Sequence, residues 1–301
     1  MSGGGASMDA VDEQRIAELT AMVRAQVTGG SDARLAEIFD ALVRHLHAFV
    51  GEVQPSDEEW GAAIEFLTRV GQFCTPTRQE FILLSDTLGV SSLVNVLNSG
   101  GGEFTESTVL GPFFVAGAPE VASGSDLAAG AKGTPLHFAG EVRGPAGEAV
   151  AGALVDTWQS DTEGFYDTQR DEGTRLRARL RTDAEGRFSF WSVVPSSYPI
   201  PQDGPVGVML AAQGRHPYRP AHLHFKIAAP GYRELVTHLF PSGDRYLDSD
   251  AVFAVAASLV KDLEHHPAGT APDGRVVEVP YDSVEQVFVL NTAGGAREGS
   301  S

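Results

Sequence analysis

The chain is poor in cysteine, in positive charge and in long apolar runs. A single cysteine, Cys74, excludes an intramolecular disulfide and a thiolate metal cluster. Only 22 Lys and Arg residues stand against 40 Asp and Glu residues, and the net charge of −18 argues against a surface for nucleic acid or an anionic membrane. No apolar stretch reaches the length of a membrane span, and residues 1–10 lack the apolar segment of a signal peptide. These absences favour a cytoplasmic protein that binds neither nucleic acid nor a membrane.

The hydrophobic pattern changes once along the chain, after Gly100–Gly102. Before that point, apolar residues recur at helical spacing over residues 16–27, 35–46, 60–73, 79–88 and 92–97. Ser56 with Glu59, and Thr77 with Glu80, each fit a capping box. After it, turn residues separate short strand patterns at 136–142, 154–159, 177–181, 187–193, 206–210, 221–227, 235–240 and 284–290, while residues 250–256 fit a short helix.

This pattern predicts an α+β fold in which an N-terminal helical domain is followed by an antiparallel β-sandwich that carries the catalytic or binding site. We place a disordered tail at residues 1–10, the helical domain at 11–105, the sandwich at 106–293 and a second disordered tail at 294–301.

Two histidines one residue apart form the first candidate site. His222 and His224 lie in the strand pattern 221–227, where alternate residues share a face, so both imidazoles can reach one metal ion. His45 and His47 have the same spacing, but they lie in a helical pattern, where such residues point about 200° apart and cannot chelate one ion. Histidines also serve as buried hydrogen-bonding residues, so the pair alone leaves both roles open.

Two tyrosines strengthen the metal hypothesis. Tyr166 and Tyr198 lie in turn-like settings at the ends of strand patterns, where functional side chains are often displayed. Tyrosine is usually a packing residue, and as a ligand it must lose a proton whose ordinary pKa is about 10. Two imidazoles and two phenolates would suit a hard, oxidised metal such as Fe(III) rather than Fe(II), because anionic oxygen donors stabilise the higher charge.

Several motifs, in order along nearly the whole chain, resemble the non-haem Fe(III) intradiol ring-cleavage dioxygenases. They lie at residues 106–114, 155–161, 164–167 (GFYD), 194–198 (VPSSY) and 219–225 (RPAHLHF). The resemblance implies one Fe(III) per chain, held by Tyr166, Tyr198, His222 and His224. It further implies that a small aromatic diol or triol reacts with O2, that Tyr198 takes a substrate proton, and that Arg219 and His238 act beside the bound substrate.

Residues 196–201, 214–218 and 246–253 look most like the hydroxyquinol 1,2-dioxygenase branch. Members of that branch commonly have a histidine at the place of His238, where catechol 1,2-dioxygenases usually carry glutamine. The resemblance therefore implies cleavage of hydroxyquinol (1,2,4-trihydroxybenzene) to 3-hydroxy-cis,cis-muconate, the enol tautomer of maleylacetate. Action on catechol or substituted catechols is the alternative. The pocket wall implied by the resemblance comprises Leu83, Asp86, Val109, Leu110, Gly111, Pro112, Phe113, Ile200, Pro201 and Val252.

Asp86 has two interpretations. Leu83 and Asp86 are three apart in a helical pattern and share one face, so the carboxylate could accept a hydrogen bond from a third ring hydroxyl. It could equally be a solvated or capping residue near the helix end.

The apolar stripes of the N-terminal helices exceed what one sandwich face can cover, and members of the resembled family pair through these helices. We therefore expect a homodimer, with a phospholipid as a further candidate at its interface. A β-sandwich module that binds without catalysis is the non-enzyme alternative, and the set of four candidate ligands disfavours it.

Overall fold

The structure is a computed structural model that describes residues 10–75, 78–99, 103–128, 130–170 and 173–293. Its chain forms two compact units, residues 1–68 and 69–301, with the boundary inside helix α3. The helices are α1 (Ala10–Val27), α2 (Ala33–Val53), α3 (Asp57–Gln72), α4 (Glu80–Thr87), α5 (Val90–Asn98) and α6 (Pro205–Ala212). Short 3₁₀ helices lie at η1 (Asp167–Gln169), η2 (Leu247–Ser249) and η3 (Ala257–Leu259).

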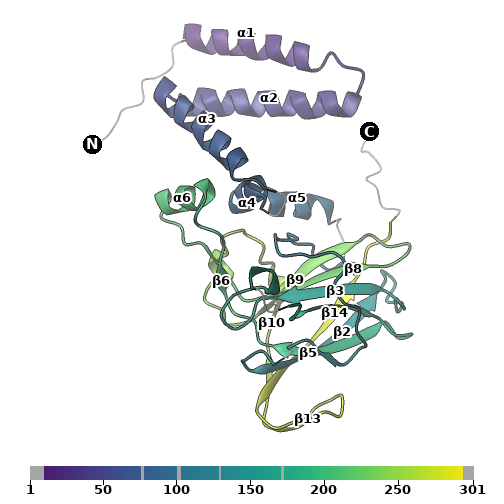
Figure 1. The fold of residues 1–301 in the computed structure, drawn as a ribbon. Coiled ribbons are helices and arrows are strands. Elements are labelled where there is room, and N and C mark those ends of the chain that lie inside the picture. Colours follow the sequence, from purple (N-terminus) through teal and green to yellow (C-terminus); the bar gives the residue numbers. More distant parts are fainter. Residues whose placement is uncertain (1–9, 76–77, 100–102, 129, 171–172, 294–301) are drawn as a thin grey trace. The chain divides into compact units, whose positions relative to one another are not determined.

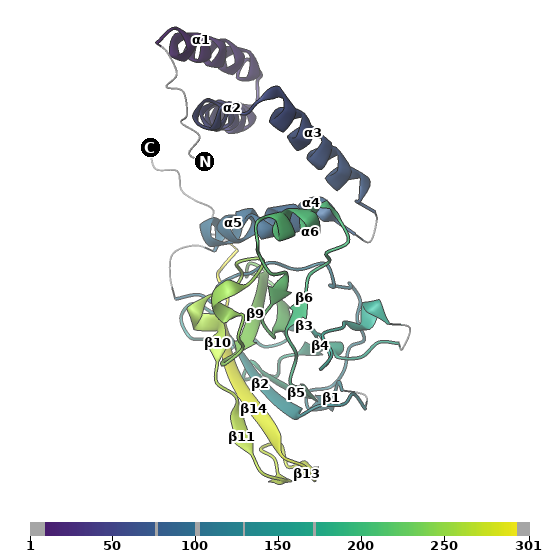
Figure 2. The same ribbon diagram turned by 90° about the vertical axis from the view of Figure 1, so that its left-hand side faces the viewer.

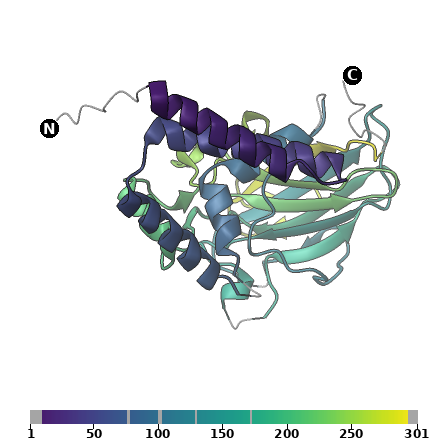
Figure 3. The ribbon, with the colours of Figure 1, turned by 90° about the horizontal axis from the view of Figure 1, so that it is seen from above.

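In the first unit, α1 and α2 form a helical hairpin (Figures 1 and 3). Arg24 on α1 donates two hydrogen bonds to the Asp40 carboxylate on α2, at 2.6 and 2.9 Å. His47, half of the second histidine pair, lies on α2 as expected, and its Nδ1 lies 2.8 Å from Oγ1 of Thr20. The predicted capping box at the start of α3 is confirmed, because the Ser56 amide donates to Glu59 and the Glu59 amide donates to the Ser56 hydroxyl.

The second unit contains two five-stranded sheets packed face to face (Figures 1 and 2). One sheet has the order β1-β5-β2-β14-β11, from β1 (Ser125–Asp126), β5 (Arg187–Val193), β2 (Pro135–Arg143), β14 (Tyr281–Val289) and β11 (Glu264–His266). The other has the order β10-β9-β8-β3-β4, from β10 (Val260–Lys261), β9 (Leu235–Pro241), β8 (Leu223–Ala228), β3 (Leu154–Gln159) and β4 (Arg177–Arg181). Two small ladders pair β6 (Tyr198–Pro199) with β7 (Tyr218–Arg219) and β12 (Gly269–Thr270) with β13 (Val276–Val277).

Aromatic rings from both sheets fill the space between them. Phe138 of β2 packs on Phe190 of β5 and on Phe225 of β8, with ring centroids 5.0 and 4.8 Å apart. Gly140 is required beside them, because an added Cβ would lie 2.4 Å from the Phe188 ring. The predicted α+β fold, with helices followed by a sandwich, is confirmed.

The structure corrects three details of the sequence prediction. Residues 206–210 belong to α6 and not to a strand, because an all-apolar run has no period that separates the two, while Gly204 and Pro205 are helix-start residues. Residues 250–256 form a turn and not a helix, since Phe253 has a left-handed φ of +55°. The sandwich is not wholly antiparallel, because β14 pairs with β2 in parallel, and alternation alone does not specify strand direction. Thr77 of the second capping box lies outside the described residues.

No single helix in the described part of the chain is long and apolar enough to cross a membrane. Helices α4 and α5 meet the length and composition test only when taken together, across a bend of 76°.

His137 on β2 gives the sandwich a testable dependence on pH. It is buried against Trp191, and its Nε2 has no hydrogen-bond partner among the described residues. Burial lowers the pKa of His137, although the charges of Asp273 and Glu285 oppose this effect. The unfolded chain therefore binds a proton at about pH 6.5 while the folded chain does not, so stability is lost as pH falls from there through the folded pKa.

We expect His137→Phe to weaken the loss of stability between pH 7.5 and 5 by up to about 1.4 kcal/mol per pH unit, the limit for one proton. Urea unfolding at a series of pH values measures this difference, and the exposed His265→Gln variant is the control. An identical pH dependence in His137→Phe and the parent would contradict the prediction.

Candidate metal centre

Strand β8 positions the histidine pair by its alternation. Leu223, Phe225 and Ile227 point into the sandwich core, so His224 points to the opposite face of the sheet. His222 comes immediately before the strand, and its Nε2 lies 3.1 Å from Nε2 of His224. Both side chains are buried.

A tight turn positions Tyr166. The Asp161 carboxylate accepts hydrogen bonds from the amides of Glu163 and Phe165, and the amide of Tyr166 donates to the side chain of Gln169. These bonds fix the backbone on both sides of Tyr166, and the ring of Phe113 stacks on the tyrosine at 4.3 Å.

A two-stranded ladder positions Tyr198, which pairs directly with Arg219 across β6 and β7. The loop of Tyr166 approaches this ladder closely at Gly164, which has φ +86°. An added Cβ there would lie 2.9 Å from Cβ of Tyr198 and 3.3 Å from the Ser197 carbonyl oxygen. The glycine is thus needed for the two tyrosines to meet.

Four donor atoms converge at this point. Oη of Tyr166 lies 3.3 Å from Oη of Tyr198, 3.3 Å from Nε2 of His222 and 2.8 Å from Nε2 of His224. A first-row metal ion about 2.0–2.1 Å from nitrogen and oxygen ligands holds neighbouring ligands about 2.9–3.4 Å apart. The donor spacing therefore fits a single small cation.

The histidines have the protonation state that a ligand needs. Burial, reinforced by the charge of Arg219, lowers the pKa of His222 well below its ordinary value. Burial also lowers the pKa of His224, with further contributions from the neighbouring histidines. The Nδ1 of His222 lies 2.7 Å from the carbonyl oxygen of Pro220, so Nδ1 donates there and Nε2 keeps its lone pair toward the other donor atoms.

The tyrosines fit a hard cation better than an empty apolar pocket. Burial, followed by the proximity of Tyr198, raises the pKa of Tyr166 well above its ordinary value. A phenolate at this place at neutral pH therefore requires a strongly polarising cation. Nitrogen and oxygen donors without thiolate are also the set expected for such an ion.

His238 on β9 lies directly opposite His224 on β8, and the two form a hydrogen bond of 2.8 Å between Nε2 of His238 and Nδ1 of His224. The ligand atoms of His222, His224 and His238 all lie within 4.8 Å of one another, so a three-histidine site is geometrically conceivable. Nε2 of His238 is engaged with His224, so we expect His238 to orient the His224 ring.

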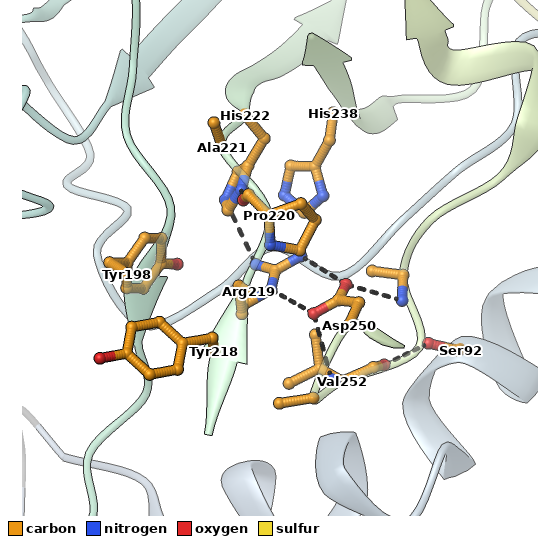
Figure 4. Close-up of polar contacts among 12 residues, drawn as sticks. Ser92, Tyr198, Tyr218, Arg219, Pro220, Ala221, His222, His238, Asp250 and Val252 are labelled. Atoms are coloured by element: carbon orange, nitrogen blue, oxygen red, sulfur yellow. Dashed lines mark hydrogen bonds and ion pairs between the residues drawn. The ribbon is translucent and has the colours of Figure 1, made fainter. Parts of the chain in front are cut away.

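Arg219 brings a buried positive charge to the same place (Figure 4). Its Nη1 lies 3.3 Å from Nε2 of His222, while Nε and Nη2 donate to Asp250 at 3.2 and 3.3 Å. Burial lowers the pKa of Arg219, but the charge and hydrogen bonds of Asp250 together with the nearby Tyr198 and Tyr166 more than offset it, so the net pKa is raised. The guanidinium is permanently charged, and its charge is balanced locally by one carboxylate.

The structure brings part of the predicted pocket wall together. Val109, Ile200 and Val252 form one buried cluster against which Leu83 packs, and an added Cβ at Gly111 would lie 3.4 Å from Cε1 of His224. Leu110 and Pro112 are exposed, and Pro201 is half-buried.

Asp86 is buried on α4, and its Oδ1 has no hydrogen-bond partner in the described part of the chain. Burial raises the pKa of Asp86, while a hydrogen bond from Ser91 and the charge of Arg219 oppose the rise. The solvated alternative for Asp86 is therefore wrong.

Two residues at the site were missed by the sequence analysis. Trp158 stacks on the His224 ring at 4.5 Å, and the shared face of neighbouring strands β3 and β8 was the available signal. Asp250 pairs with Arg219 from a segment that was expected to be a helix, so its direction could not be anticipated.

Two family profiles match the chain. The profile described as "Dioxygenase" matches residues 109–287, and the profile described as "Catechol dioxygenase N terminus" matches residues 32–101. Together they cover the sandwich, the site and much of the helical region.

Individual proteins agree with the profiles. The chain is 52% identical to the 6-chlorohydroxyquinol 1,2-dioxygenase of Cupriavidus pinatubonensis, over 84% of this chain and 92% of the relative. It is 46% identical to the hydroxyquinol 1,2-dioxygenase of Nocardioides simplex, over 95% of this chain and 99% of the relative. A crystal structure of hydroxyquinol 1,2-dioxygenase from Pseudomonas putida matches with a TM-score of 0.87 and 45% identity, covering 93% of this chain and 99% of that one. The chain therefore belongs to the intradiol ring-cleavage dioxygenases, a family of non-haem iron enzymes.

Proposed function

We propose that the protein is a hydroxyquinol 1,2-dioxygenase with one Fe(III) per chain, held by Tyr166, Tyr198, His222 and His224. The observation that carries this proposal is the convergence of four buried oxygen and nitrogen donors at spacings of 2.8–3.3 Å. When bound, ferric iron would take up the adjacent hydroxyl oxygens of the substrate and make the ring reactive toward O2, whose two atoms enter the product.

The chain's own groups would handle protons and charge. Tyr198 would be the proton acceptor for a substrate hydroxyl, and its pairing with Arg219 across the β6–β7 ladder brings a buried cation near it. Arg219 would stabilise negative charge that develops on the ring, because a buried guanidinium acts in a medium with little screening. His238 and the Trp158 ring would hold His224 in position, and the indole keeps water from one face of that imidazole.

The substrate class follows from Asp86 and from the relatives. A buried carboxyl oxygen without a partner can form a hydrogen bond with a ring hydroxyl in either protonation state of the carboxyl. Catechol lacks the third hydroxyl and would leave Oδ1 of Asp86 unpartnered. The relatives at 46–52% identity bear hydroxyquinol or chlorohydroxyquinol in their names. We infer that hydroxyquinol is preferred, giving 3-hydroxy-cis,cis-muconate and its tautomer maleylacetate, and that catechol is the slower alternative.

We further propose a homodimer formed through the N-terminal helices. Helix α2 has no buried residue, and its exposed side chains include Leu35, Ile38, Leu42, Leu46 and Phe49. Such a continuous apolar face is typical of an interface. A hollow of about 590 Å³ beside it, lined by α1 and α2 residues such as Ile16, Ala17 and Arg44, would suit the acyl chain and phosphate of a phospholipid. A cytoplasmic location stays a prediction.

Removing a histidine ligand and removing a tyrosine ligand should affect iron content and kcat differently. We expect His224→Ala to retain less than about a tenth of the iron, because even a change beside a ligand weakens metal affinity about 10–100-fold. Tyr198→Phe should keep more iron but lose about 10²–10⁴-fold in kcat, the usual contribution of a proton acceptor. Metal analysis with steady-state kinetics measures both effects.

Matched controls for these two variants are His216→Ala and Tyr218→Phe, which change neighbouring residues outside the donor set. Stoichiometric zinc without a visible phenolate-to-iron absorption band in the parent, or equal iron loss in both variants, would contradict the assignment.

The parent should have a higher kcat/KM for hydroxyquinol than for catechol, and Asp86→Ala should reduce that ratio about ten- to a hundredfold. The expected change corresponds to loss of a hydrogen bond worth about 1.5–3 kcal/mol to a charged group. Asp86→Asn, which retains an acceptor oxygen, should fall between them. A parent that prefers catechol would refute the substrate proposal, whereas an unchanged ratio in Asp86→Ala would remove only this residue from it.

The dimer should depend on the apolar face of α2. We expect the double change Leu42→Glu with Leu46→Glu to convert dimers into monomers, because burying two carboxylates in an apolar interface is strongly unfavourable. Light scattering measures the particle mass, with the exposed Arg34→Gln on the same helix as the control. A parent that is monomeric at micromolar concentration would exclude the proposed dimer.

A further inference from the structure

The carboxylate of Asp250 makes four hydrogen bonds in two matched pairs (Figure 4). Its Oδ1 accepts from Nε of Arg219 and from the Val252 amide, both at 3.2 Å. Its Oδ2 accepts from Nη2 of Arg219 at 3.3 Å and from the Ala254 amide at 3.1 Å. Each oxygen therefore joins the guanidinium to the backbone of the turn at residues 250–254.

This arrangement fixes the direction of Arg219. Two of the three guanidinium nitrogens are taken by Asp250, which leaves Nη1 directed at His222. Both side chains of the pair are almost fully buried, at 3% and 2% exposure, so water cannot substitute for either partner. A planar guanidinium held by two bonds to one carboxylate has a defined orientation as well as a balanced charge.

The same carboxylate holds part of the pocket wall. Val252, whose amide it binds, packs with Val109 and Ile200 in the buried cluster. The carbonyl of Val252 is held from the other side by the hydroxyl of Ser92 on α5, at 3.0 Å. Ser92 thus contacts the turn without contributing to the Arg219 pair.

We propose that Asp250 is a positioning residue of the ring-cleavage reaction. It orients the Arg219 guanidinium toward the substrate and couples this orientation to the position of Val252 in the pocket wall. The inference rests on the role proposed above for Arg219. Asp250 itself touches neither substrate nor iron, and it acts through the guanidinium. A purely structural ion pair would stabilise the fold without a specific dependence of catalysis on Arg219.

A double-mutant cycle separates these two roles, because non-additivity measures coupling between residues. We expect Asp250→Asn to lower kcat about 10–100-fold, with a smaller change in KM and unchanged iron content. Arg219→Gln should lower kcat by at least as much. In the double variant, the second change should cost less than about threefold, because Asp250 has no guanidinium left to position.

Controls address the folding of the variants. Asp183→Asn also removes a carboxylate that accepts two backbone amides, in the β4–β5 turn, and should leave kcat unchanged. Ser92→Ala loosens the Val252 turn alone, and its effect should multiply with that of Arg219→Gln. Asp250→Glu keeps the charge and should remain folded, yet lower kcat at unchanged iron content because its longer side chain displaces the guanidinium.

The outcomes distinguish the inference from the function on which it rests. Unchanged kcat in Arg219→Gln would overturn the role of Arg219 and this inference together. A cost in Arg219→Gln with multiplicative effects of Asp250→Asn, or a folded Asp250→Glu variant with full activity, would overturn the positioning role alone.

Discussion

The alternation of strand β8 is the constraint on which the site depends. Leu223, Phe225 and Ile227 are locked into the aromatic core between the two sheets. Their packing fixes the direction of the residues between and before them, so the histidines reach the opposite face in a set orientation. If the pairing register of β8 shifted by one residue, leucine would replace imidazole at the site, and the histidine rings would be buried in the apolar core. The two histidines of the candidate metal centre are thus placed by hydrophobic packing on the far side of the sheet.

The titratable side chains of the site are buried, and each is either neutral or part of an ion pair. Burial lowers the pKa values of His222, His224 and His238 and raises that of Tyr166. The permanent charge on Arg219 is matched by Asp250, and that on the nearby Arg177 is matched by Asp167. An entering cation therefore meets lone pairs and ionisable phenols, with no imidazolium to repel it. Affinity for a cation and stability of the fold make compatible demands on these side chains.

The sequence predicted what depends on local pattern and on residue type. Helical spacing and strand alternation were sufficient to place the N-terminal helices ahead of the longer sandwich strands, and the spacing of His222 and His224 was sufficient to bring their imidazoles together. The nature of residues 206–210 could not be predicted in this way, because a uniformly apolar segment is compatible with either period. The Asp250–Arg219 ion pair could not be predicted from the sequence either, because it joins a turn to the β6–β7 ladder through a tertiary contact that residue spacing does not reveal.

The parallel pairing of β14 with β2 has a consequence for how the domain is made. Strand β14 lies inside its sheet, between β2 and β11, although it comes last in sequence among the strands that the structure describes. Phe288, which it contributes, packs against Phe138 and Phe225 in the middle of the core. During synthesis the earlier strands therefore emerge with an open sheet edge and an unfilled core, and the sandwich closes only after residue 289 leaves the ribosome. Folding of this domain therefore depends on contacts between segments far apart in the sequence, which exposes the incomplete sheet to aggregation or to chaperones until β14 is in place.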